Sequence, residues 1–151
     1  MTLFERVEAE FRQAMKAGDA ARRMVLSLLK SAIHNSAIAQ RKKDAALGDD
    51  EVQDVILTEL KRRRDSAAQY KTAGRSDLVK KEEEEAAVLM RFLPPQLSDA
   101  ELRALVKGAV AASGAASVKD TGKVLAVLAG QLKGRADMSA VVQIVKEQLS
   151  G

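Results

Sequence analysis

The chain has 151 residues, 46% of them hydrophobic and 30% charged, with a formal net charge of +4 at pH 7. This length is enough for one ordinary domain or two small ones, each with a buried core. Charged residues recur too often to leave the roughly 18 uninterrupted apolar residues of a membrane-spanning helix, and the absence of cysteine excludes disulfides, thiolate metal sites and cysteine nucleophiles.

The N-terminal segment predicts a soluble cytoplasmic protein without a membrane partner. It carries Glu5, Glu8 and Glu10 among its apolar residues, so it has neither the basic nor the apolar region of a secretory signal peptide. The absence of cysteine agrees with a reducing compartment.

The N-terminal part of the chain predicts four helices. The first begins at a Thr2–Glu5 capping box and ends at Gly18-Asp19; the second follows and ends in the charged run 41–44. Gly48-Asp49-Asp50 caps a third helix that runs toward Gly74, and Ser76 or Asp77 caps a fourth that Pro94-Pro95 stops. The residues expected in the core include Phe4, Phe11, Met15, Val25, Leu28, Leu29, Ile33, Val52, Ile56, Leu60, Leu89 and Phe92.

After the prolines the sequence predicts three short helices. Their starts are a capping box at 98–101, the segment 117–120, and Asp137 or Ser139. The residues expected inside include Leu102, Val106, Ala109, Val124, Val127, Leu128, Leu132, Met138, Val141 and Val145. We therefore predict an all-α fold, with an N-terminal antiparallel domain of long helices at 1–95 and a small three-helix domain at 96–151.

The inventory of catalytic groups is poor. His34, the only histidine, is interpreted as an ordinary residue at the edge of the core. The string from Ser27 to Lys30 has none of the companion motifs of serine–lysine enzymes, and Gly122-Lys123 lacks the first glycine and the hydroxyl residue of a phosphate-binding loop. We expect no catalytic residue, metal or cofactor.

Two charged runs lie on consecutive predicted helices. Residues 82–85 are all glutamate and splay around a helix axis, which favours a solvated face over a cation site. Residues 61–64 are all basic; they fit either salt bridges to the glutamates or a contact with nucleic acid.

The C-terminal part contains seven basic and five acidic residues. Five of the cations are predicted at helix starts, helix ends and glycine-marked turns, where backbone N–H groups are also available to phosphate oxygens. These candidate phosphate contacts are Lys119, Lys123, Lys133, Arg135 and Lys146, with Gly122 and Gly134 permitting close backbone approach. Ordinary surface charge is the alternative, and composition alone does not choose between them.

The same segments resemble the GatB/YqeY family. The strings DTGKV at 120–124 and LKGRAD at 132–137 are similar to its signature, and KRRRDS at 61–66, GRSDL at 74–78 and FLPPQLS at 92–98 match further family segments. The resemblance covers nearly the whole chain and indicates a free-standing YqeY-like protein. Two neighbourhoods depart from the family pattern, because no proline precedes Lys133 and no glycine follows Asp137.

The resemblance implies an all-helical protein whose C-terminal part is similar to the tail domain of the B subunit of glutamine-dependent tRNA amidotransferases, which contacts tRNA. It implies a tRNA-binding or amidotransferase-associated accessory protein, with tRNA and amidotransferase or aminoacyl-tRNA synthetase components as candidate partners. The family label is a carbon–nitrogen ligase with glutamine as amido-N-donor, but no amidase serine–lysine system or ATP site is visible. A protein–protein interaction module without RNA binding is the alternative.

Overall fold

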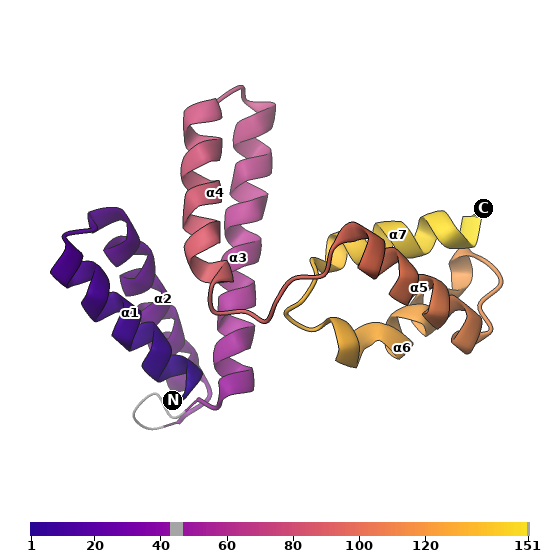
Figure 1. Cartoon of the computed structure of the whole chain (residues 1–151), viewed down its shortest axis with the longest axis horizontal. Coiled ribbons are helices and arrows are strands. Elements are labelled where there is room, and N and C mark those ends of the chain that lie inside the picture. The colour runs from indigo at the N-terminus through magenta and orange to yellow at the C-terminus, as the bar shows by residue number, and fades with distance from the viewer. Residues whose placement is uncertain (43–46, 151) are drawn as a thin grey trace. The chain divides into compact units, whose positions relative to one another are not determined.

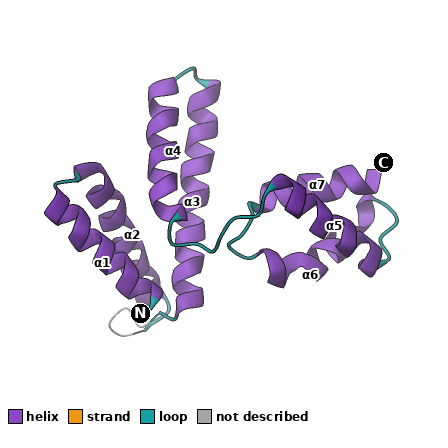
Figure 2. Ribbon diagram, in the orientation of Figure 1, coloured by secondary structure: helices purple, strands orange, loops and turns teal. Residues whose placement is uncertain are grey.

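The computed structural model describes residues 1–42 and 47–150, and these residues contain helices and no strand, which confirms the all-α prediction (Figures 1 and 2). The chain divides into two compact units, Met1–Leu93 and Pro94–Gly151. The first contains α1 (Leu3–Ala17), α2 (Ala20–Ala39), α3 (Asp49–Thr72) and α4 (Ser76–Met90). The second contains α5 (Asp99–Ser113), the short 3-10 helix η1 (Val118–Asp120), α6 (Thr121–Leu132) and α7 (Met138–Ser150).

The start of α1 shows the predicted capping box. The Thr2 hydroxyl accepts the Glu5 N–H at 3.1 Å, while the Glu5 carboxylate accepts the Thr2 N–H at 2.8 Å. Gly18 ends the helix in the left-handed conformation at φ 68°, and the Asp19 carboxylate then caps α2 by accepting the Arg22 N–H. The short connection lets α1 and α2 pack side by side.

The start of α3 agrees with the prediction, whereas the start of α4 differs from it. Gly48 is the N-cap of α3, and the Asp49 carboxylate accepts the N–H of Leu3 at 2.9 Å, which ties the first turn of α3 to the start of α1. The predicted cap of α4 at Ser76 or Asp77 is wrong: the N-cap is Arg75, which makes no side-chain cap hydrogen bond. Asp77 instead pairs with the Arg75 guanidinium at 3.3 Å. The predicted end of α2 falls partly on residues 43–44, outside the described residues.

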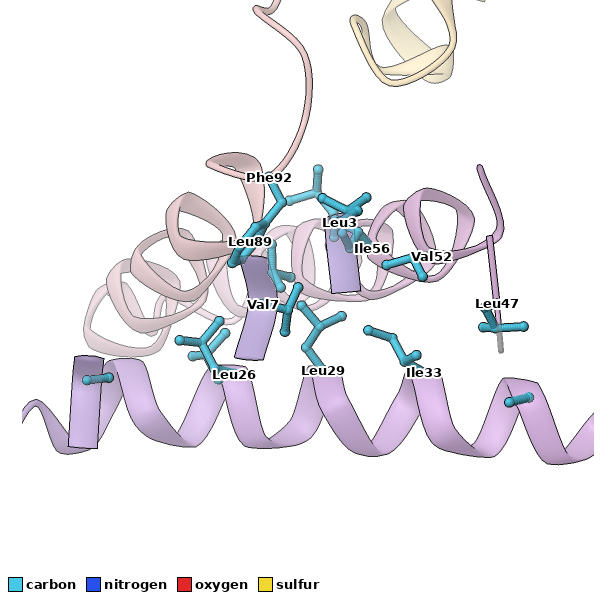
Figure 3. Packing of buried hydrophobic residues seen from close by; sticks show 14 residues of the cluster. Leu3, Val7, Leu26, Leu29, Ile33, Leu47, Val52, Ile56, Leu89 and Phe92 are labelled. Carbon is cyan, nitrogen blue, oxygen red and sulfur yellow. The ribbon is translucent and has the colours of Figure 1, made fainter. Parts of the chain in front are cut away.

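The first unit has one continuous core to which all four helices contribute. Leu26, Leu29 and Ile33 point from α2 into this core (Figure 3). Two residues predicted inside are exposed: Met15 is 53% and Leu28 is 50% exposed. On both helices the neighbouring residue, Ala14 or Leu29, occupies the core position instead, and a step of one residue turns a side chain by about 100° around the helix.

The second unit begins as predicted. The Ser98 hydroxyl accepts the Glu101 N–H at 3.1 Å, the return hydrogen bond completes the capping box, and Gly114 ends α5 at φ 70°. The segment predicted to open the next helix forms η1, and α6 begins at Thr121 directly after it. The Asp137 carboxylate accepts the Ser139 N–H at the start of α7.

A separate core holds α5, α6 and α7 together. Its centre is formed by Val106, Val124, Leu128, Leu132, Val141 and Val145, all of them buried. Two predicted core residues are exposed, Val127 at 41% and Met138 at 46%. The buried stripe of α6 follows the four-residue spacing of Val124 and Leu128, so Val127 lies beside this stripe and faces solvent.

Within the described residues, no helix combines the length and the apolar composition needed to cross a bilayer.

Candidate nucleic-acid interface

Four of the five predicted phosphate contacts fall at the two ends of α6. Lys119 lies in η1 and Lys123 in the first turn of α6, whereas Lys133 and Arg135 follow its last turn. With a rise of 1.5 Å per residue, Lys123 and Lys133 are separated by about 15 Å along the axis of α6. The structure therefore forms two cationic groups, at opposite ends of one helix, in place of a single cluster.

At the N-terminal end of α6 an acidic side chain shares the surface with the cations. The Asp120 carboxylate accepts the N–H groups of Ala116 at 2.9 Å and Ser117 at 3.3 Å, which holds the pKa of Asp120 below its usual value. The Lys123 ammonium lies 3.8 Å from this carboxylate, so its charge is partly offset. Lys119 is exposed to solvent.

At the C-terminal end of α6 the backbone forms a tight, well-anchored turn at residues 133–135. Gly134 is buried and has φ 75°, a left-handed conformation that favours glycine, and the Arg135 N–H returns to the Leu132 carbonyl at 2.9 Å. The Lys133 side chain is exposed, and the half-buried Arg135 donates to the Gln131 carbonyl at 3.4 Å. We call residues 133–135 the basic turn.

The remaining predicted site residues differ in their setting. Lys146 is exposed, but it lies within α7 and not at a helix end or turn, so that part of the prediction is wrong. Gly122 lies inside α6, lacks a positive φ, and has open space where a Cβ would project. The fold therefore requires glycine at Gly134 and does not require it at Gly122.

The five acidic residues of the second unit are engaged with the protein itself. Asp99 and Glu147 both pair with Arg103, at 2.8 and 3.1 Å. The other three carboxylates accept hydrogen bonds at helix starts: Glu101 at α5, Asp120 at η1 and Asp137 at α7. Carboxylates at these positions are offset by the positive ends of the helices, so they cancel less of the field of the exposed lysines.

A family model described as Yqey-like protein matches residues 4–149 of the chain. The chain belongs to the Yqey-like protein family. No curated protein gives a significant match to it. The family match includes both units and every residue of the candidate interface.

One residue of the basic run at 61–64 of this Yqey-like chain, Arg63, has a structural role. Arg63 is only 8% exposed; its guanidinium lies 3.3 Å from the Glu59 carboxylate on α3 and 3.4 Å from Glu85 on α4. For Arg63 the interhelical salt-bridge interpretation is confirmed. Its burial was missed in the sequence, although it lies three residues after Leu60 and seven after Ile56 and so continues the core stripe of α3.

The weak catalytic candidates do not assemble into a site. His34 is exposed and lies in a surface hollow with Phe4 and Phe11, which pack against the core. Lys30 of the serine–lysine string places its ammonium 4.6 Å from the centre of the Phe11 ring, a cation–π contact between α2 and α1. Glu84 and Glu85 of the acidic run pair with different partners, Lys80 and Arg63.

Proposed function

We propose that this Yqey-like protein is an accessory tRNA-binding protein that contacts the RNA backbone with its C-terminal unit. The observation that carries the proposal is the division of charge in this unit. Its carboxylates are engaged at helix starts or with Arg103, while Lys119, Lys133 and Lys146 extend exposed side chains. A polyanion approaching this surface meets cations whose field is only partly compensated.

The arrangement favours contact with the RNA backbone over the reading of bases. Two cationic groups about 15 Å apart can meet separate phosphates of one RNA molecule. The unit contains no Phe, Tyr or Trp, so it has no aromatic side chain on which a base could stack. Recognition would rest on charge and on the shape of the folded RNA.

We infer an accessory role for the chain in tRNA metabolism. We place the protein beside enzymes that act on charged tRNA, with amidotransferase or aminoacyl-tRNA synthetase components as candidate partners. The choice of these partners is supported by the family resemblance together with the exposed cations of the C-terminal unit. In this role the chain would help to hold tRNA while another protein performs the chemistry.

The direct test reverses the charge of the basic turn. We expect Lys133→Glu/Arg135→Glu to lower tRNA affinity by more than about tenfold at low salt, because two phosphate contacts become repulsive. The matched control is Lys61→Glu/Lys107→Glu, which changes two exposed helical lysines and gives the same net charge. Binding is measured by filter retention or fluorescence anisotropy. An equal loss in the control would show that net charge, and not this site, governs binding.

One observation favours the alternative, a protein-interaction module. Met24, Leu28 and Ile38 are 57%, 50% and 59% exposed on α2. Exposed apolar side chains that recur along one helix are suited to covering by a partner. If this alternative holds, amidotransferase or synthetase components should co-purify after nuclease treatment, Leu28→Glu should abolish that association, and the unmodified protein should not bind tRNA.

A further inference from the structure

The basic turn is held from outside by the segment that opens the second unit. The Gln96 side-chain amide donates to the Gly134 carbonyl at 2.7 Å, and the Leu97 N–H donates to the Arg135 carbonyl at 2.9 Å. The same Gln96 amide also donates to the Pro94 carbonyl at 2.9 Å. Residues 38 positions apart are thus joined by two consecutive hydrogen bonds, which fix the two peptide groups that orient the basic turn.

These hydrogen bonds also determine the orientation of the peptide groups in the basic turn. Gly134 is buried and left-handed, so its carbonyl direction is set by an uncommon backbone conformation that needs a matching donor. The direction in which the side chains of Lys133 and Arg135 leave the backbone depends on those same peptide planes. A donor that holds the planes therefore also holds the two cations in one orientation relative to each other.

We propose that Gln96 is a positioning residue for RNA binding, and that it acts by presenting Lys133 and Arg135 to adjacent phosphates of the RNA backbone. The inference rests on the proposed function, because it assigns a role within the same site. Gln96 itself need not touch RNA. It lowers the cost of binding because the basic turn is already ordered when the phosphates arrive.

A hydrogen bond of the same kind elsewhere in the unit provides a matched control. The Gln148 side-chain amide donates to the Arg103 carbonyl at 3.1 Å, across 45 positions of sequence and away from the basic turn. Both glutamines give one long-range side-chain hydrogen bond to a backbone carbonyl. Only Gln96 is bonded to the basic turn, so loss of fold stability and loss of positioning can be separated.

The experiment compares Gln96→Met with Gln148→Met in the full-length chain; methionine keeps the length of the side chain and removes the donor. Total tRNA is titrated against each protein, and stability is measured by urea unfolding. We expect Gln96→Met to weaken binding by about three- to tenfold, as for one lost hydrogen bond, and Gln148→Met to leave binding within about twofold. Gln96→Asn, whose amide is one methylene too short to reach, should weaken binding like Gln96→Met.

A double-mutant cycle then tests whether Gln96 acts through the cations. In the Lys133→Glu/Arg135→Glu background, Gln96→Met should cause no further loss of affinity, because the residues that it positions no longer bind. Equal affinity of Gln96→Met and the parent protein, or an undiminished loss in the reversed background, would overturn the inference. Absence of tRNA binding by the unmodified protein would instead overturn the proposed function, so the two failures are distinguishable.

Discussion

The basic run at 61–64 and the basic turn at 133–135 differ in the surroundings of their cations. Arg63 of α3 is buried between Glu59 and Glu85, where its charge joins two helices. The cations of the basic turn lie in a loop whose backbone is anchored by two hydrogen bonds, and the Lys133 side chain is exposed. A basic string in a sequence is therefore informative about binding only when the location of its counter-charges is known.

The difference follows from where each unit places its acidic residues. In the first unit the glutamate partners lie on the helix faces that pack against each other, within reach of Arg63 at one-turn spacing and across the α3–α4 pair. In the second unit the acidic residues lie at helix starts or pair with Arg103. Lys133 and Arg135 follow the end of α6, in the segment that leads to α7. Substitution of a structural cation such as Arg63 should therefore lower the free energy of unfolding, whereas substitution of a candidate binding cation should lower the affinity for RNA.

The largest expected effect of this kind is on stability. We expect Arg63→Met to lower the free energy of unfolding by about 2 kcal/mol, because the partly buried carboxylates of Glu59 and Glu85 lose their shared counter-charge. Arg62→Met is the control, since the Arg62 side chain is 72% exposed and its pair with Glu59 should contribute less than about 0.5 kcal/mol. Urea unfolding measures both.

Arg63→Met also tests whether Arg63 contributes to RNA binding. Arg63→Met should leave tRNA affinity unchanged under conditions in which the protein stays folded. A weakened affinity without loss of structure would mean that Arg63 contributes to RNA binding, and the distinction between the two basic segments would then be wrong.

A smaller effect is expected at Gly122, where the demands of fold and binding oppose each other. A Cβ at Gly122 meets nothing within 4 Å, so Gly122→Ala should keep or slightly raise stability, by up to about 1 kcal/mol. If a phosphate approaches the backbone here, the added methyl group should weaken tRNA binding by about two- to fivefold. Gly130→Ala, also on α6 with open space around it, is the matched control and should leave affinity unchanged. Identical affinities for both variants would remove Gly122 from the interface.

The smallest effect concerns acid sensitivity at the N-terminal end of α6. The N–H groups of Ala116 and Ser117 lower the pKa of Asp120 in the folded state. The Asp120 carboxylate therefore contributes to stability above its pKa in the unfolded chain, which is about 4, and this contribution is lost as the pH falls through the folded-state pKa. Asp120→Asn should flatten the stability profile in this acidic range. An unchanged profile from thermal unfolding at several pH values would contradict the assignment.

The sequence predicted most of the local structure because the signals were short-range. Both capping boxes, at Thr2 and Ser98, and the left-handed ends at Gly18 and Gly114 are set by residues at most a few positions apart. Errors arose where apolar residues are more numerous than core positions. At Leu28, for example, the neighbouring Leu29 occupies the core position and the exposed leucine cannot be recognised from hydrophobicity alone.

The features of the candidate site that the sequence did not predict are long-range. The five cations were named, but the placement of four of them at the two ends of α6, and of Lys146 within α7, depends on the helix lengths that the chain adopts. The hydrogen bond from Gln96 to Gly134 joins residues 38 positions apart and has no local signature. The burial of Arg63 had a visible signal in the core stripe of α3, which the basic string concealed.

The most direct test of the account is the salt dependence of tRNA binding by the full-length protein. If the five predicted cations contact phosphates, log K should fall linearly with log salt with a slope of about −3.5 to −4.5, and Lys133→Glu/Arg135→Glu should reduce the magnitude of that slope by about 1.5. Absence of binding at low salt, or a slope that the reversal leaves unchanged, would contradict the claim that the C-terminal unit binds RNA through the basic turn.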